Sequence, residues 1–543
     1  MKKLLFVVLA LALSFNLKAE IKDVKYSSKT VEIKCHEILD VVFTSKEKPT
    51  SPFETEFTAN FVSPSGKELN LQGFYNGGQE WIVRFSASES GEWKYQTSSS
   101  LRSLNNKKGK ITVSSKSYGN RRGMIVKSKE YPKNVFYEDG TPYFMMGFEC
   151  DFLYALDYKN VQSTPILDKF LDGVARNGFN HIVMNVYATD VVWQKDEKLK
   201  SNPHHEFGNL EYIYPFGGTN KNPDHSTLNV EFFKKFDRTI EALNDRNIVS
   251  HLMIYVWNKA VNWPKILGDD DVRYFEYVIK RYQAFTNIVW DISKEALLYG
   301  TVEDKHILQK LEDVRRLDNY KRLVTVHDMG FCSRHSDKVD FISNQNWHLA
   351  TNSLMIKDYN NFKDKPNFNI EHGGYEECDY FVFSGNYINA EMCLRRNWEC
   401  AFAGVYSTYY WQGCSWNVII YDWESLGDNH YKPKMHYFKH MTDFWKKYPF
   451  HTFVPDSQHN NSGYTMTNKK DTYLVYLPKE SFRTSLKTLA KVAKRVSYQY
   501  FNTFTGEYSP IQESEVKSFF SPSSSPWHMS ADVVLIVKVL EKR

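Results

Sequence analysis

Cysteine is scarce in this sequence, and no two cysteines form a CxxC pair. The chain has seven cysteines among 543 residues, an odd number. They are scattered singly, at Cys35, Cys150, Cys332, Cys378, Cys393, Cys400 and Cys414. This spacing is typical of buried free thiols. We therefore expect neither a disulfide framework nor a zinc site built on paired cysteines.

A strong excess of charge of either sign is also missing. Lysine and arginine together number 69 and the acidic residues 64, so the formal net charge is +5. Removing residues 1–19 would take away Lys2, Lys3 and Lys18 and leave 5 − 3 = +2. A nearly neutral protein gives no reason to expect binding to nucleic acid or to a membrane surface.

No apolar run is long enough to cross a bilayer, which requires about 20 residues. The longest candidate is the stretch 4–15, which follows Lys2 and Lys3 and precedes the small residue Ala19. This order is typical of a signal peptide, so we predict cleavage near Ala19. We expect export to the periplasm or the medium and no membrane insertion.

The full chain is 42% hydrophobic and 16% aromatic, enough for two or three domains with apolar cores. Short alternating runs separated by turn signals fill residues 20–118 and predict an N-terminal β-sandwich. Residues 448–543 return to this pattern, and there we predict a smaller C-terminal β-sandwich.

Between these parts, residues 134–446 alternate apolar strands with amphipathic helices. Eight strands are expected, at 143–149, 180–187, 247–256, 287–293, 322–327, 340–346, 367–371 and 402–410. This number of strand and helix units predicts an α/β fold of the (β/α)8 TIM barrel type. A doubly wound open sheet is less well supported, because no glycine-rich phosphate turn follows the first strand.

Glutamates stand at or just after the ends of the fourth and seventh predicted strands. Glu295 follows the fourth strand and Glu371 ends the seventh, so both belong to the open face of the barrel, where reactive groups project. Strands four and seven lie on opposite sides of the barrel mouth. Two carboxyl groups about 5–5.5 Å apart carry out retaining glycoside hydrolysis. We predict Glu295 as the acid/base and Glu371 as the nucleophile.

Other polar and aromatic residues near the strand ends suggest a sugar site. The candidate substrate-binding residues are Asn185, Tyr187, Tyr255, Trp257, Lys294, His327, Trp347, His348, His372 and Trp411. Any single one of them could equally be a packing residue. The segment 188–229 is too long for a routine connection. We expect it to form a wall of the cleft, with Trp193, Tyr212 and Tyr214 as further contacts.

No metal and no cofactor are expected. His204 and His205 are adjacent, and adjacent histidines do not readily bind one ion from the same face. The acidic run at 268–271 is typical of a helix start. No Ser-centred nucleophile elbow and no Walker loop are visible.

Three segments of the barrel carry a family resemblance: "YPFGGTNKNPDHSTLNVEFFKKFDRTIEALNDRNI", "NIVWDISKEA" and "KPNFNIEHGGYE". They resemble the bacterial apiosidase-like and cellulase-like barrels of glycoside hydrolase clan A. The segment "GFYNGGQEWIVRFSASESGEWKY" looks like the sandwich that often precedes such barrels. "SYQYFNTFTGEY" looks like the collagen-binding-type β domain that follows them. The resemblance implies a secreted glycosidase of Bacteroidetes type, with Glu295 as acid/base and Glu371 as nucleophile.

One residue departs from the pattern of this clan. Asn commonly precedes the acid/base, whereas this chain has Lys294. A lysine that pointed into the site would lower the pKa of a nearby carboxyl, and a general acid needs the reverse. We therefore expect that Lys294 either faces away or meets an anionic group, such as a sulfate or uronate of the substrate.

Together these features predict an exported retaining glycoside hydrolase without a cofactor, whose partner is a polysaccharide or its oligosaccharides. One alternative is a non-catalytic glycan-binding surface protein on a decayed barrel. A polysaccharide lyase is a third possibility.

Overall fold

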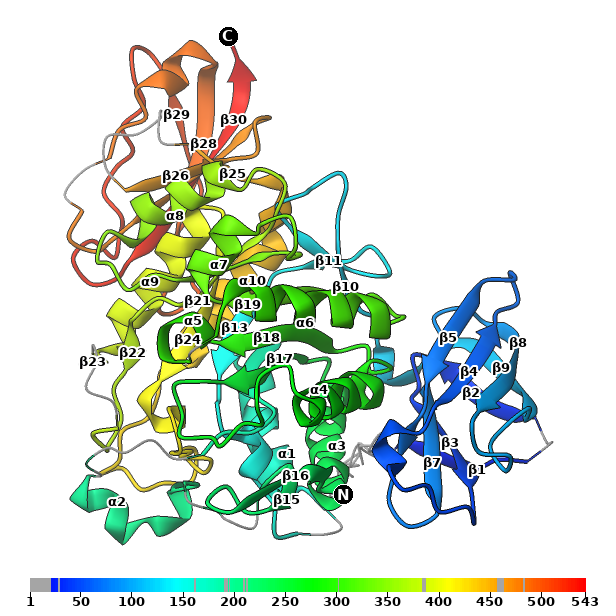
Figure 1. Cartoon of the computed structure of the whole chain (residues 1–543). Coiled ribbons are helices and arrows are strands. Elements are labelled where there is room, and N and C mark those ends of the chain that lie inside the picture. Colours follow the sequence, from blue (N-terminus) through cyan, green and yellow to red (C-terminus); the bar gives the residue numbers. More distant parts are fainter. Residues whose placement is uncertain are drawn as a thin grey trace, which may run out of the picture.

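The computed structural model describes residues 21–27, 30–160, 163–189, 194, 196–208, 210, 213–300, 302–382, 387–456, 463–481 and 484–543. The predicted signal peptide lies outside these residues. Figure 1 shows a central barrel with β sheets at either end of the chain. No helix in the described ranges has both the length and the apolar character that crossing a bilayer would require.

Eight parallel strands form the barrel, as the sequence predicted. They are β13 (Met146–Glu149), β14 (His181–Asn185), β17 (Val249–Val256), β18 (Ile288–Lys294), β19 (Val324–His327), β20 (Ile342–Gln345), β21 (Asn367–Glu371) and β24 (Tyr406–Trp411). Each pairs with its neighbour along the chain, and β24 pairs with β13, except that β19 and β20 form no ladder among the described residues. There the Asp340 backbone N–H donates to the Val324 carbonyl at 2.8 Å, and the Thr325 hydroxyl donates to the Phe341 carbonyl at 2.9 Å.

A helix follows each barrel strand. These helices are α1 (Pro165–Arg176), α3 (Val230–Asp245), α4 (Asp269–Tyr282), α6 (Asp304–Leu317), α7 (Met329–Arg334), α8 (Thr351–Asn361), α9 (Ala390–Phe402) and α10 (His436–Lys447), with the short α5 (Ala296–Tyr299) before α6. The Asn229 side chain caps α3 by accepting from the Phe232 N–H at 3.2 Å. The predicted apolar face of α3 is buried, and the acidic run after Gly268 forms the first turn of α4, as expected.

The long 188–229 connection contains structure of its own. Its described residues form α2 (Glu197–Ser201), a 3-10 turn η4 (Pro203–His205) and a hairpin of β15 (Phe216–Gly218) and β16 (Pro223–Leu228). Figure 1 places α2 and this hairpin at the edge of the barrel far from the C-terminal sheet.

The N-terminal part is the predicted sandwich of two sheets around a shared apolar core. The first sheet has the order β1-β3-β7-β6 and the second β2-β9-β8-β4-β5. Their strands are β1 (Lys22–Lys25), β2 (Val31–Cys35), β3 (Leu39–Thr44), β4 (Phe57–Val62), β5 (Glu68–Gln72), β6 (Phe74–Tyr75), β7 (Glu80–Phe85), β8 (Gly91–Ser99) and β9 (Lys108–Ser117). A small sheet of β10 (Ile125–Lys127), β11 (Val135–Tyr137) and β12 (Pro142–Tyr143) leads into the barrel.

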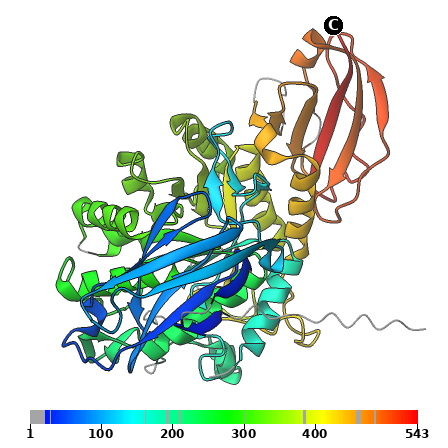
Figure 2. The ribbon, with the colours of Figure 1, turned by 90° about the vertical axis from the view of Figure 1, so that its right-hand side faces the viewer.

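Figure 2 shows the sandwich lying in front of the barrel. Buried ion pairs fix the two parts to each other. Arg84 of β7 lies 2.7 Å from Asp40 of β3 and 2.9 Å from Asp237 of α3. Arg281 of α4 lies 2.7 Å from the same Asp237. Because these side chains are almost fully buried, the sandwich and the barrel form a specific interface.

The C-terminal part forms one antiparallel sheet of six strands, in the order β25-β26-β27-β30-β28-β29. They are β25 (Val454–Pro455), β26 (Tyr464–Thr467), β27 (Thr472–Leu477), β28 (Ala493–Asn502), β29 (Gln512–Glu515) and β30 (Val533–Lys542). We expected two sheets here, but the described residues build one, because one face of the sheet packs on the barrel instead of on a second sheet. Trp398 of α9 stacks on Tyr476 of β27 at this contact, with ring centroids 5.9 Å apart.

Candidate functional site

A cavity of about 600 Å³ lies at the carboxyl ends of the barrel strands. It is lined by Glu149, Asp151, Asn258, Lys294, Glu295, Leu298, Tyr299, Gln345, Trp347, Glu371, Tyr375, Ser415 and Trp416. A second cavity, of about 730 Å³, lies at the opposite end of the barrel and is lined by Arg122, Arg246 and Lys446 among others, with no carboxylate among its described lining residues. Of these two cavities, only the first is lined by paired acids among the described residues.

The structure brings Glu295 and Glu371 together in this cavity through the amide of Gln345. The Gln345 Nε2 donates to Glu295 Oε1 at 2.8 Å and to Glu371 Oε2 at 2.6 Å. These two carboxylate oxygens can therefore be separated by no more than the sum of the two bonds, 5.4 Å. This limit agrees with the spacing of about 5–5.5 Å typical of retaining glycosidases and is shorter than the 6.5–9.5 Å of inverting ones.

Irregular strand pairing determines which side chains near the strand ends point into the barrel. The register between β18 and β19 shifts by one residue between Asp291 and Lys294. A one-residue shift moves a side chain to the other face of a sheet. Asp291 accordingly lies inside the barrel, 3.0 Å from His251, and Lys294, three residues later, also points inward. A similar shift, next to Gln345, occurs between β20 and β21.

The backbone of Glu295 has an unusual conformation. Its φ of 55° and ψ of 35° lie in the left-handed region, which residues other than glycine seldom adopt. The residue ends β18 and precedes α5, and its N–H donates to the His327 carbonyl at 3.1 Å. Strained backbone of this kind is concentrated at functional sites, where the surrounding structure enforces it.

Lys294 points into the site and is surrounded by carboxylates of the protein itself. Its ammonium lies 2.8 Å from Glu371, 2.9 Å from Glu149 and 3.8 Å from Asp151. Its side chain is only 3% exposed. Burial alone would lower the pKa of Lys294, but these carboxylates raise it well above its usual range. The expectation that Lys294 faces away is therefore wrong, and the anionic groups that it meets belong to the protein.

The carboxyl groups of the cavity have different proton affinities. Burial raises the pKa of Glu295, and the neighbouring charge of Glu371 raises it further. Burial also raises the pKa of Glu149 well above its usual value. Burial would raise the pKa of Asp151 as well, but its lysine neighbours, including Lys259 at 3.3 Å, hold that pKa below its usual range. A site with both protonated and ionised carboxyls can supply an acid and a nucleophile.

Three further predicted residues lie at or under this cavity. Trp347 lines it. His327 is fully buried beneath Glu371, with its Nε2 4.0 Å from Glu371 Oε1. Burial and then the charge of Lys294 lower the pKa of His327 to about 3, so its ring is neutral. Asn185 is buried behind Asp151, to which its amide donates at 3.3 Å.

Four predicted sugar contacts are packing residues that do not reach the cavity, which corrects the sequence prediction. Trp411 is 1% exposed and packs edge-on against Trp423. Tyr187 is packed among aromatic side chains near α3. The Tyr255 hydroxyl donates to Asp271 of α4 at 2.5 Å, so this ring faces the helix layer. The His372 ring is hydrogen-bonded through its Nε2 to the Thr408 carbonyl at 2.8 Å.

The remaining predicted contacts also fall outside the lining. Trp257 is half-buried and stacks on a neighbouring tyrosine, and His348 is exposed beyond the rim. Tyr214 is buried, and its hydroxyl donates to the Asn262 carbonyl at 2.9 Å. Trp193 and Tyr212 lie outside the described residues.

Sequence reasoning missed several residues that line the cavity. Glu149 ends the first predicted strand and Asp151 follows two residues later, so the argument that selected Glu295 and Glu371 would have found them too. Gln345 ends strand six and was passed over beside its neighbours Trp347 and His348. Tyr299 ends the short helix α5, Tyr375 lies in the two-residue strand β22 (Tyr375–Glu376) and Trp416 lies in a turn, and none of these short segments has a periodic pattern that would mark it.

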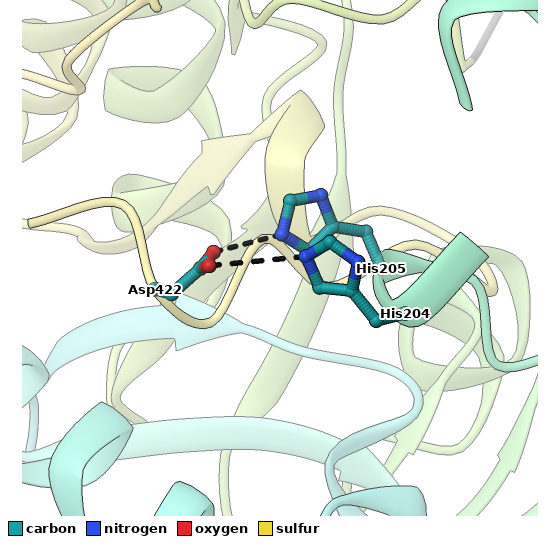
Figure 3. Close-up of side chains that lie close together, drawn as sticks. All are labelled: His204, His205 and Asp422. Carbon is teal, nitrogen blue, oxygen red and sulfur yellow. Dashed lines mark hydrogen bonds and ion pairs between the residues drawn. The ribbon is translucent and has the colours of Figure 1, made fainter. Parts of the chain in front are cut away.

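Another group of ligand-type side chains lies away from this cavity. His204, His205 and Asp422 place their ligand atoms within 4.8 Å of one another. Figure 3 shows both imidazole rings facing the same carboxylate. The rings are 4.0 Å apart between centroids, so the adjacent histidines do face one point, contrary to the sequence argument.

Comparison with known proteins supports the same fold. The model of a family described as "Apiosidase-like, catalytic domain" matches residues 130–452, more than half of the chain. A domain family of unknown function (DUF5060) matches residues 32–100, within the N-terminal sandwich. No curated protein matches the chain.

Solved structures share the architecture at low sequence identity. A protein of Bacteroides vulgatus ATCC 8482, provisionally described as a glycoside hydrolase, is 19% identical with a TM-score of 0.69, and the match covers 94% of this chain and all of that one. A glycoside hydrolase family 5 protein of the same organism is 16% identical with a TM-score of 0.56, covering 77% of this chain and 94% of that one. At these identities the likeness concerns the fold alone.

Proposed function

The chain belongs to the apiosidase-like family of catalytic domains, and we propose that it is a retaining glycoside hydrolase acting on a complex polysaccharide or its oligosaccharides. The observation that carries this proposal is the Gln345 amide, which bonds to both Glu295 and Glu371 and limits the distance between their oxygens to 5.4 Å. For these two oxygens that limit is shorter than the about 6.5–9.5 Å at which an inverting enzyme holds its carboxyls apart to admit a water.

In the first step Glu371 attacks the anomeric carbon, and Glu295 gives its proton to the departing glycosidic oxygen. A covalent glycosyl-enzyme forms and the glycosidic bond breaks. In the second step Glu295, now ionised, takes a proton from water, and the resulting nucleophile releases the sugar from Glu371 with its original configuration. Burial and the charge of Glu371 raise the pKa of Glu295, as a general acid requires.

Lys294 stabilises the ionised form of the nucleophile, Glu371, and does not assist the acid, Glu295. Its ammonium is paired with Glu371 at 2.8 Å, and that positive charge favours a carboxylate ready to attack. Glu149 and Asp151 share the same cation and hold it in position. The ammonium lies where it can also donate to a hydroxyl of the sugar, which is the part that asparagine plays in the clan.

Aromatic residues around the cavity suit a sugar ring, since apolar ring faces pack on them. Trp347, Tyr375, Tyr299 and Trp416 supply these surfaces.

The basic and apolar start of the sequence supports export of the enzyme, so that it meets its polysaccharide outside the cytoplasm.

The test is hydrolysis of a polysaccharide panel by the unaltered protein and by Glu295→Gln and Glu371→Gln. We expect sugar release by the unaltered protein and losses of at least about 1000-fold in both variants. Glu303→Gln is the matched control, because Glu303 is an exposed glutamate outside the cavity, and it should retain full activity. Proton NMR of the first product should show a retained anomeric configuration.

Other outcomes would contradict the proposal in distinguishable ways. Binding of a glycan without any cleavage would favour a non-catalytic binding protein. Products that absorb in the ultraviolet would indicate a lyase, and an inverted anomer would exclude the nucleophilic role of Glu371.

A further inference from the structure

The cluster of His204, His205 and Asp422 has the composition of a metal site. We propose that these three residues bind a divalent transition metal ion of the Zn²⁺ type, and that the ion joins the 188–229 connection to the loop after β24. Two imidazoles and one carboxylate form a ligand set that zinc accepts, with a fourth position for water.

The distances within the cluster support coordination. The His204 Nε2 lies 3.9 Å from Asp422 Oδ2, which is too long for a hydrogen bond. It is somewhat longer than the about 3.3–3.6 Å that separates two ligand atoms of a tetrahedral zinc ion, so a small approach of the His204 ring would bring the two atoms to that separation. The His205 Nε2 lies 2.7 Å from the other oxygen, Oδ1 (Figure 3). A small outward movement of these groups would place an ion between them.

The surroundings of His205 prepare it as a ligand. Its Nδ1 is 2.8 Å from the Tyr380 hydroxyl, a partner that orients the ring and leaves Nε2 directed at Asp422. Histidines that bind metals usually have such a partner on the second nitrogen. His204, with a side chain 47% exposed, leaves the cluster open to an ion from solvent.

The cluster lies where two loops are already joined. The Phe207 N–H donates to the Asn417 carbonyl at 2.7 Å, and the Ile419 N–H donates to the His205 carbonyl at 2.9 Å. Ser415 and Trp416, a few residues before Asp422, line the catalytic cavity. An ion bound by η4 and this loop would therefore fix one wall of that cavity. The ion itself takes no part in the chemistry, because none of its ligands lines the cavity.

The experiment uses the full-length chain without an affinity tag, after dialysis against EDTA. Calorimetric titration with Zn²⁺ should show one site per chain with micromolar or tighter affinity. Co²⁺ should give the visible absorption of a low-symmetry site with few ligands. The temperature of thermal unfolding should rise when Zn²⁺ is added and fall back to its original value when the ion is removed by a chelator.

His204→Ala and Asp422→Asn test the ligands, and His528→Ala is the control because His528 is an exposed histidine in the C-terminal part. We expect the first two to weaken Zn²⁺ binding at least 100-fold and to lose the thermal shift, and the control to behave as the unaltered protein. Neither variant removes a fully buried group, so both should fold. Unchanged binding in both, or no binding to the unaltered protein, would overturn the proposal. Neither result depends on glycosidase activity.

Discussion

Replacing Lys294 by methionine should destabilise the barrel, because it removes a cation from among three carboxylates. The ammonium pairs with Glu371, Glu149 and Asp151, and its side chain is 3% exposed. After the change, the nearest cation is Lys259, 3.3 Å from Asp151. Removing one partner of a buried ion pair costs about 3–5 kcal/mol, because the other partner stays buried without compensation.

The expected fall in melting temperature follows from the size of the barrel. The family match spans residues 130–452. Unfolding entropy of about 2.1 cal/mol/K per residue gives about 0.7 kcal/mol/K for this length. A loss of about 3–5 kcal/mol therefore corresponds to a decrease in Tm of about 4–7 °C. Scanning calorimetry of the full chain measures this decrease directly.

The loss of stability caused by Lys294→Met should also depend on pH, and the structure gives the direction of this dependence. Burial raises the pKa of Glu149 in the folded protein above its unfolded value, so its contribution to stability falls as pH rises through the folded pKa. Removing the charge of Lys294 raises that pKa further. Protonation of Glu149 at lower pH then relieves the repulsion. The decrease in Tm should therefore be smaller at about pH 5.5 than at about pH 8.

A double variant tests whether Lys294 stabilises the carboxylates around it. In the Lys294→Met background, Glu149→Gln removes one uncompensated charge, so it should cost less there than in the unaltered protein. Lys305→Met, which removes an exposed lysine, should change Tm by less than about 1 °C. Additive effects of the two substitutions at Lys294 and Glu149, or the same decrease in Tm at both pH values, would show that Lys294 does not stabilise these carboxylates.

Three further outcomes follow. Gln345→Met should lower kcat/KM about 10- to 100-fold and move the basic limb of its pH profile upward, because the Gln345 hydrogen bond lowers the pKa of Glu295; an unmoved limb would contradict this role. Arg84→Met should destabilise the chain by about 3–5 kcal/mol in calorimetry, because Asp237 and a second aspartate lose a buried partner, and an unchanged Tm would mean that the sandwich is not held there. A thiol reagent should label at most Cys378 in the native protein and seven thiols after denaturation without reductant, since the other cysteines are buried; fewer than seven would reveal disulfides.

The barrel could be predicted because its strands are apolar runs between helices with clear start and stop signals. All eight predicted strands exist, and most ends differ by one to three residues. The pairing of Glu295 with Glu371 also followed from topology, since strands four and seven of a closed barrel face each other across its mouth. These features depend on periodicity and order along the chain, which a sequence contains directly.

The lining of the cavity could not be predicted in the same way, because it depends on the direction of single side chains. A register shift in β18 turns Lys294 inward, and nothing in its neighbours' composition marks that shift. Trp411 ends β24 and Tyr255 is the last residue but one of β17, yet both face the packed layers. The position of a residue at a strand end therefore did not decide between the cavity and the core.

The left-handed backbone of Glu295 has a consequence for how this protein can change. Glycine would adopt that conformation without strain, and asparagine with little. Random substitution judged by folding alone would thus favour losing the glutamate, and a descendant freed from its substrate should drift towards a more stable, inactive chain. If Glu295 is the acid/base that we propose, the chain keeps a strained glutamate at this position for the sake of activity, and Glu295→Gly should raise stability while abolishing turnover.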